Sequence, residues 1–165
     1  MPDLKLIALD ADDLAVLSAH LQDAVLRVGD MLFSPKEKRF VALGNRFDWG
    51  KALSPAQKPA RGAKISDGLE RRRTGLRFER VLAAKVSGID LKDRRATLAL
   101  LAITFQPATA AASSDVSASP DGDVTLTFSG GAAIRLTVEC LEAEMKDLGA
   151  AWSTKRSPAH PDDSV

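Results

Sequence analysis

The chain is poor in the residues that build disulfide-stapled and zinc-stabilised domains. Its 165 residues include one cysteine, Cys140, and two histidines, His20 and His160. A single cysteine cannot close an internal disulfide, and zinc normally takes three or four ligands from His, Cys and carboxylates, of which the sequence shows no cluster. We therefore expect a domain that depends on its own hydrophobic core, with no metal and no other cofactor.

Targeting, membrane and catalytic signals are also missing. The opening stretch MPDLKLIALDADD is acidic and has no basic leader, so it does not predict a signal peptide. No run approaches the roughly 20 apolar residues of a membrane span. The GxSxG, GxGxxG and P-loop patterns do not occur. With the lone cysteine, these absences predict a cytoplasmic protein that lies off the membrane and has no catalytic residues of a familiar kind.

What the sequence does contain is alternation of apolar and polar residues at period two, the pattern of β-strands. It is clearest in Val124–Phe128 and Ile134–Val138, which flank the turn Ser129–Gly131 and predict a hairpin. Other runs that alternate in the same way, or that are apolar throughout, predict further strands. These runs are Leu4–Leu9, Leu26–Phe33, Arg39–Asn45, Thr74–Ser87 and Ala96–Phe105. Thr74–Ser87 and Ala96–Phe105 should together form a long hairpin.

Two segments show helical spacing instead. Asp10 is typical of an N-cap, and leucines at helical spacing after it predict a helix from Ala11 to about Asp23. Near the other end, acidic residues lie mostly off an apolar stripe, which predicts an amphipathic helix over Glu139–Leu148 that Gly149 would stop. The stripe consists of Val138, Leu141, Met145 and Leu148.

These elements predict an α+β fold that is mainly antiparallel. A partly open β-barrel or bent sheet, with the C-terminal helix over its mouth or face, would bury one face of the sheet and limit its open edges. The outline is pleckstrin-homology-like. We expect one globular domain over residues 1–152, with long loops at 51–68 and 107–123 and a disordered tail at 153–165.

Charge is segregated along the chain, although the net charge is only +1. Residues 1–23 hold five acids and one base, whereas residues 58–95 hold twelve bases and five acids. Segregation of this kind can mark an interaction surface.

The basic segment 71–95 has two interpretations. In an extended strand Arg71, Arg73, Arg77 and Lys85 share one face, with Arg80 opposite, and could neutralise phosphates of RNA. Phe78 is the one aromatic residue among them and the chain has no tyrosine, so base stacking is poorly provided for. We favour the other interpretation, a solvated face neutralised by the acidic N-terminal part.

The NRFDWG motif at residues 45–50 also has two interpretations. Arg46, Asp48 and Trp49 could form a binding lip, because Trp and Arg are favoured anchors of interfaces. The motif could instead plug one end of the barrel, which we favour. An unfamiliar enzyme site around His20, Arg46 and Asp48 is a further alternative. We expect His20 to be a surface or boundary histidine, and Cys140, at the start of the last helix, to be packed and inert.

Several blocks of the sequence together resemble an uncharacterised bacterial family catalogued as domain of unknown function 2948. They are LKLIALDADDLAVLSAHLQDAVLRVGD, NRFDW, RRRTGLRFERV and AIRLTVECLEAEMKDLGAAW. The resemblance covers almost the whole chain outside the two loops and the tail. It implies a bacterial source, but no activity and no catalytic residue.

The sequence as a whole favours a non-enzymatic binding or adaptor domain for a protein or peptide partner. The candidate partner-binding residues are Arg46, Asp48, Trp49, Arg71, Arg73 and Arg77. An RNA- or ribosome-associated protein using residues 71–95 is the alternative. A continuous positive face would favour nucleic acid, and a pocket joining His20, Arg46 and Asp48 would favour an enzyme. A groove or an exposed sheet edge would favour a peptide.

Overall fold

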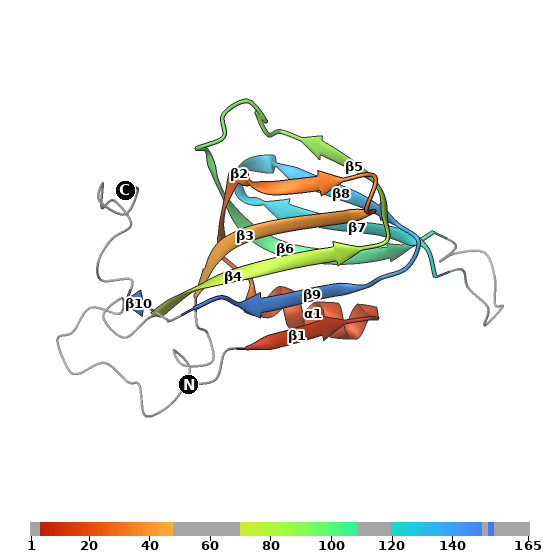
Figure 1. The fold of residues 1–165 in the computed structure, drawn as a ribbon, viewed down its shortest axis with the longest axis horizontal. Helices are drawn as coiled ribbons and strands as arrows, with labels where there is room; N and C mark the ends of the chain where they lie inside the picture. The colour runs from red at the N-terminus through yellow and green to blue at the C-terminus, as the bar shows by residue number, and fades with distance from the viewer. Residues whose placement is uncertain (1–3, 48–69, 109–119, 150–151, 154–165) are drawn as a thin grey trace.

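The computed structural model of the chain describes residues 4–47, 70–108, 120–149 and 152–153. Antiparallel strands dominate these residues, with a single α-helix near the N-terminus (Figure 1). The elements are β1 (Lys5–Ala8), α1 (Ala11–His20), β2 (Val25–Ser34), β3 (Arg39–Phe47), β4 (Glu70–Glu79), β5 (Val81–Ser87), β6 (Thr97–Pro107), β7 (Gly122–Phe128), the 3-10 turn η3 (Ser129–Gly131), β8 (Ala133–Val138), β9 (Ala143–Asp147) and β10 (Trp152–Ser153).

The strands form one open, strongly bent sheet. Its order is β1-β9-β4-β3-β2-β6-β7-β8-β5, and β10 pairs with β4 beside this path. Because neighbouring strands curl around a common interior (Figure 1), every second residue of a strand faces the core. On β7 these residues are Val124, Leu126 and Phe128, all at most 1% exposed.

A corner at Arg80 joins β4, the third strand of this path, to β5, its last strand. Arg80 has a φ of +59° between β4 and β5, a conformation that turns the chain sharply. The Glu79 N–H donates to the Glu142 carbonyl at 2.9 Å, and the Glu139 N–H donates to the Arg80 carbonyl at 2.9 Å. Pairing therefore continues around the bend, from β4 with β9 to β5 with β8.

The N-terminal half follows the sequence prediction. The Asp10 side chain accepts a hydrogen bond from the Asp13 N–H and caps α1. Leu14 and Leu17 bury one side of the helix, which packs against β6 and β1. The predicted strands at 4–9, 26–33 and 39–45 correspond to β1, β2 and β3, and the late hairpin to β7 and β8.

The predicted C-terminal helix over Glu139–Leu148 is wrong, because residues 143–147 form strand β9. Ala143, Met145 and Asp147 point into the core, while Glu144 and Lys146 point outward. Met145 would be buried both at helical spacing and in the two-residue repeat of a strand. Asp147 distinguishes the two, because a helix would leave its polar side chain in solvent, whereas strand β9 buries it. Leu148, which the helix would have buried, is 40% exposed. The pleckstrin-homology-like outline included that helix and is not confirmed.

Two smaller corrections follow from the topology. The predicted hairpin between 74–87 and 96–105 does not form, because β5 pairs with β8 while β6 lies between β2 and β7. The corner at Arg80 divides the first of these runs and carries its second half away from β6. The predicted loop 107–123 begins and ends in paired strand residues, since Pro107 lies opposite Gly122. Its middle, the loop 51–68 and residues 154–165 of the predicted tail lie outside the described residues.

Close packing of β2 on β3 makes a first prediction at Gly44. A Cβ atom there would collide with the Leu26 side chain and lie 2.9 Å from the Val25 carbonyl oxygen. We expect Gly44→Ala to lower the free energy of unfolding by about 1–3 kcal/mol, the usual range for overpacking. Chemical denaturation would measure it. Gly75→Ala on the next strand is the control, because its Cβ would meet the flexible end of Leu148 at 3.3 Å. Equal losses in the two variants would contradict this account.

Candidate partner-binding site

Arg46 of the NRFDWG motif lies inside the sheet. It is 2% exposed, and its Nε and Nη2 donate to the two carboxylate oxygens of Asp147 at 2.8 and 2.7 Å. Its Nη1 donates to the Phe47 carbonyl at 3.1 Å. All three guanidinium nitrogens are thus engaged within the protein, which supports the structural interpretation of this residue. Asp48 and Trp49 lie outside the described residues.

Asp147 collects further hydrogen bonds on the same carboxylate. Thr74 Oγ1 donates to it at 2.9 Å, and the Leu4 N–H donates at 3.1 Å. Burial on its own would raise the pKa of Asp147, but the hydrogen bonds from Arg46 and Thr74 and the charge of Arg46 outweigh it and hold that pKa below its ordinary value. Asp147 is therefore an ionised, fully paired side chain that ties β3, β4 and the N-terminal segment to β9.

Arg71 and Arg73 lie on β4 on the face opposite to the buried Arg72. The Arg71 guanidinium stacks 3.9 Å above the ring of Phe47, and burial lowers the pKa of Arg71. Arg73 makes an ion pair with Asp30 at 4.0 Å and keeps 43% of its side chain exposed. Of these two, Arg73 is the more open to a partner.

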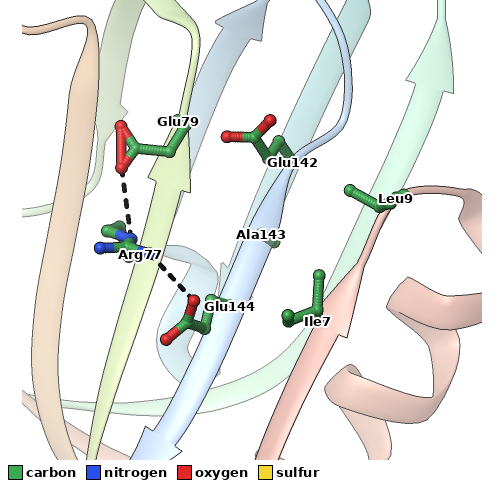
Figure 2. Close-up of a pocket in the computed structure, with 7 residues that line it drawn as sticks. All are labelled: Ile7, Leu9, Arg77, Glu79, Glu142, Ala143 and Glu144. Carbon is green, nitrogen blue, oxygen red and sulfur yellow. Dashed lines mark hydrogen bonds and ion pairs between the residues drawn. The ribbon is translucent and has the colours of Figure 1, made fainter.

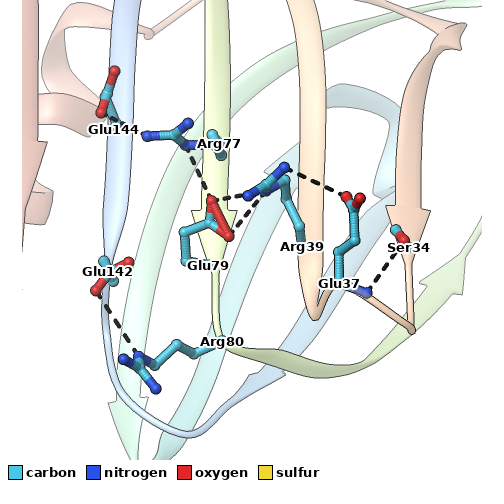
Figure 3. A network of polar contacts seen from close by, with 8 residues as sticks. All are labelled: Ser34, Glu37, Arg39, Arg77, Glu79, Arg80, Glu142 and Glu144. Atoms are coloured by element: carbon cyan, nitrogen blue, oxygen red, sulfur yellow. Dashed lines mark hydrogen bonds and ion pairs between the residues drawn. The ribbon is translucent and has the colours of Figure 1, made fainter.

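Arg77 lies in a network of ion pairs on the outer face of β4 (Figure 3). It contacts Glu79 at 3.2 Å and Glu144 of β9 at 2.9 Å. Glu79 also accepts two hydrogen bonds from the Nε of Arg39, at 3.0 and 2.8 Å, and this bonding raises the pKa of Arg39. The arginine that the sequence places at the centre of a basic strand is therefore flanked by carboxylates.

The corner carries a second group of ion pairs. Lys38 donates to Glu139 at 2.6 Å, which lowers the pKa of that glutamate. Arg80 lies 3.7 Å from Glu139 and 4.0 Å from Glu142. The arginines at 77 and 80 thus pair with glutamates of β4 and of residues 139–144, and not with the acidic N-terminal part as the sequence predicts. Lys85 does not share a face with the arginines of β4, because it lies on β5, beyond the corner.

A shallow groove runs beside this network, between β1, β9 and the end of β4 (Figure 2). We call it the corner groove, and it has a volume of about 280 Å³. Its lining residues are Ile7, Leu9, Arg77, Glu79, Glu142, Ala143 and Glu144. Ile7 and Leu9 are 54% and 61% exposed, so the groove joins an apolar wall to three carboxylates and one guanidinium.

A second depression adjoins the corner groove and shares Glu79 and Glu142 with it. It has a volume of about 240 Å³ and is lined by Glu37, Lys38, Glu79, Arg80, Glu139 and Glu142. Four of these side chains are acidic and two are basic. Both depressions thus carry more carboxylates than cations, although they border the strand that the sequence marks as basic.

Sequence reasoning missed the acidic side of this site. The sequence pattern places Glu142 and Glu144 on the solvated face of a predicted helix. Their actual positions, on and beside a strand next to β4, bring them to the arginines. Ile7 and Leu9 were part of an expected strand, but alternation alone did not show that their outer side stays open. A period-two count over 141–147 would have been the one available signal.

The remaining sequence candidates are not brought into a common site. His20 is the half-buried last residue of α1, and Cys140 is half-buried between β8 and β9, on a segment that is not helical. Within the described ranges, no cluster of three or more His, Cys, Asp or Glu side chains is arranged to hold a metal ion. The helix described in the structure is too short to cross a membrane.

The chain matches a known protein family. Residues 4–160 match the family model described as "Protein of unknown function (DUF2948)". No curated protein and no solved structure matches the chain.

Proposed function

We propose that this chain, which belongs to the DUF2948 family, is a non-enzymatic binding domain that takes a segment of a protein partner in the corner groove. The observation that carries the proposal is the lining of this groove, in which exposed Ile7 and Leu9 face Glu142 and Glu144 across a shallow depression. A peptide that alternates apolar and cationic side chains complements both walls. The reducing cytoplasm is the proposed location, which suits a chain whose one cysteine cannot pair internally.

Electrostatics favour a cationic segment over an acidic one. Three carboxylates and one guanidinium line the groove. Cations beside it also lie within 4.0 Å of these carboxylates, namely Arg39, Arg80 and Lys5, so a partner's lysine or arginine competes with exposed ion pairs. Glu142 is the most weakly paired of these carboxylates, because its nearest cation, Arg80, is 4.0 Å away and 43% of the Glu142 side chain is exposed. Exposed ion pairs are worth about 0–1 kcal/mol, so Glu142 can turn to a new cation at small cost.

The apolar wall supplies the rest of the affinity. Fully burying an isoleucine or leucine side chain contributes about 1.5–3 kcal/mol, and Ile7 and Leu9 are each about half exposed before a partner binds. The expected complex is weak, since a single shallow groove is smaller than a standard protein interface.

The proposal is tested with two matched short peptides, one alternating leucine with lysine and the other leucine with glutamate. Fluorescence anisotropy should show binding of the lysine peptide, weakened by salt, and little binding of the glutamate peptide. Glu142→Gln and Ile7→Ser should each raise the Kd of the lysine peptide by about three- to tenfold. Asp90→Asn and Leu32→Ser are the controls, because both residues are exposed and neither lines the groove. Equal binding of the two peptides, or equal effects of control and groove variants, would refute the proposal.

RNA binding is the competing outcome, and the corner argues against it. Arg77 and Arg80 are each within 4.0 Å of glutamates, so the positive face is interrupted. We expect single-stranded RNA to bind no tighter than about 10⁻⁴–10⁻⁶ M at physiological salt, the non-specific range. A submicromolar complex would favour the RNA alternative if Arg73→Ala weakened it and its log–log salt slope was about −0.7 per phosphate contacted.

A further inference from the structure

Among the strands that the structure describes, β5 is an open edge of the sheet. It is the last strand of the sheet order and pairs with β8. Alternate residues of an antiparallel strand direct their N–H and C=O groups away from the paired neighbour. In the described part of the chain, the Val81 N–H finds an acceptor on that outer side, the Lys38 carbonyl at 2.9 Å. Beyond Val81, Leu82 and Val86 are 48% and 38% exposed.

We propose that β5 pairs with β5 of a second copy of this chain, in a two-fold antiparallel arrangement with Ala84 opposite Ala84. In this register Leu82, which lies where the pairing of β5 with β8 shifts register, is opposite Val86 of the second copy, and symmetry repeats that pair. Lys85 lies opposite Ala83 of the second copy. The two exposed apolar side chains thus cover each other, and neither lysine faces another lysine.

Neighbouring registers are less favourable. A two-fold axis at Lys85 would place the two lysines directly opposite each other, which destabilises a strand pair. A two-fold axis at Ala83 would place Val86 opposite Arg80, so that Val86 has no apolar partner. The sequence VLAAKVS is therefore self-complementary about Ala84.

The β5 edge is a better place for a second copy to pair than the β1 edge at the other end of the sheet. β1 is four residues long, against seven in β5. Pairing of β1 with β5 would be head-to-tail and would build rings or filaments, whereas pairing of β5 with itself closes at two copies. Strand-edge contacts of this length are small, so the dimer should be weak.

Sedimentation of the full chain from about 10 µM to about 1 mM, a range suited to weak complexes, should show a monomer–dimer equilibrium. Val86→Lys should raise the dimer Kd by at least about tenfold, because it sets a second cation beside Lys85 and removes the Leu82 contact. Leu101→Lys is the matched control, since Leu101 is 45% exposed on β6, away from this edge. A monomer throughout, or equal effects of the two variants, would overturn the proposal, as would assembly beyond two copies.

A crosslink tests the register. In a Cys140→Ser background, Ala84→Cys should give a disulfide-linked dimer under mild oxidation, because residues opposite each other lie about 4.5–5.5 Å apart at Cα, within disulfide reach. Thr104→Cys, exposed on the central strand β6, should stay monomeric under the same conditions. A crosslink from Thr104→Cys as strong as that from Ala84→Cys would show random collision and contradict the register.

Discussion

Replacing Asp147 with alanine is expected to lower the free energy of unfolding by about 3–5 kcal/mol, the cost of removing one partner of a buried ion pair. The loss leaves the Arg46 guanidinium charged at 2% exposure and removes the acceptor of Thr74 and of the Leu4 N–H. Urea denaturation near neutral pH measures it. The control is Arg73→Ala, whose exposed ion pair is worth about 0–1 kcal/mol. A loss from Asp147→Ala no larger than that of the control would show that the pair contributes little.

Removing both charges should restore much of that stability. Replacing buried ion pairs by apolar residues of similar volume is often neutral or stabilising, so Arg46→Leu combined with Asp147→Leu should unfold less readily than Asp147→Ala alone. The recovery should be partial, because the Leu4 N–H loses its carboxylate acceptor in both. If the double variant is no more stable than the single one, the damage comes from lost hydrogen bonds and not from the stranded charge.

The same pair makes a pH prediction. The pKa of Asp147 is lowered in the folded state, so its ionisation stabilises the fold above the unfolded pKa of about 3.9 and is lost as the pH falls through the folded pKa. The difference in unfolding free energy between wild type and Asp147→Asn should therefore be constant from about pH 5 to 7 and shrink below about pH 4. A difference that shrinks as the pH rises would have the wrong sign for this carboxylate.

The second large effect is expected from Phe78→Ala, at about 3–5 kcal/mol of unfolding free energy. Phe78 is fully buried just before the corner, with its ring centroid 6.5 Å from that of Phe40, so truncation opens a cavity where β3, β4 and β9 meet. Phe105→Ala, at a partly buried ring on β6, is the control and should cost less. Similar losses from the two phenylalanines would indicate that the corner collapses around the gap.

Local signals identified the elements whose partners are close in sequence. Asp10 capped α1 as expected, and the Ser129–Gly131 turn joined β7 to β8, because a cap and a tight turn are fixed by a few consecutive residues. The prediction for the residues of β9 was wrong for the opposite reason. Its outward glutamates resemble a solvated helical face, and the partner that makes Asp147 an interior residue lies 101 positions earlier in the chain.

The candidate site likewise depends on partners that lie far apart in the sequence. Arg77 was recognised as a surface cation, which its 46% exposed side chain supports. Its acidic neighbour Glu144 was assigned to another element, so the local balance of charge could not be judged from the sequence. Arg46 was singled out for its residue type, but only the pairing of β3 and β4, with β4 next to β9, shows that it faces inward.

The place of β9 in the sheet bears on how the protein folds as it is synthesised. β9 lies between β1 and β4, and the Leu4 N–H reaches a carboxylate 143 positions later. β1 is therefore made long before β9, the strand with which it pairs. Such long-range pairing is slow to form, and until residues 143–147 emerge the nascent chain leaves the edges of β1 and β4 open to other strands. Chaperone dependence during translation, relieved once residues 143–147 have emerged and paired, is the behaviour this topology implies.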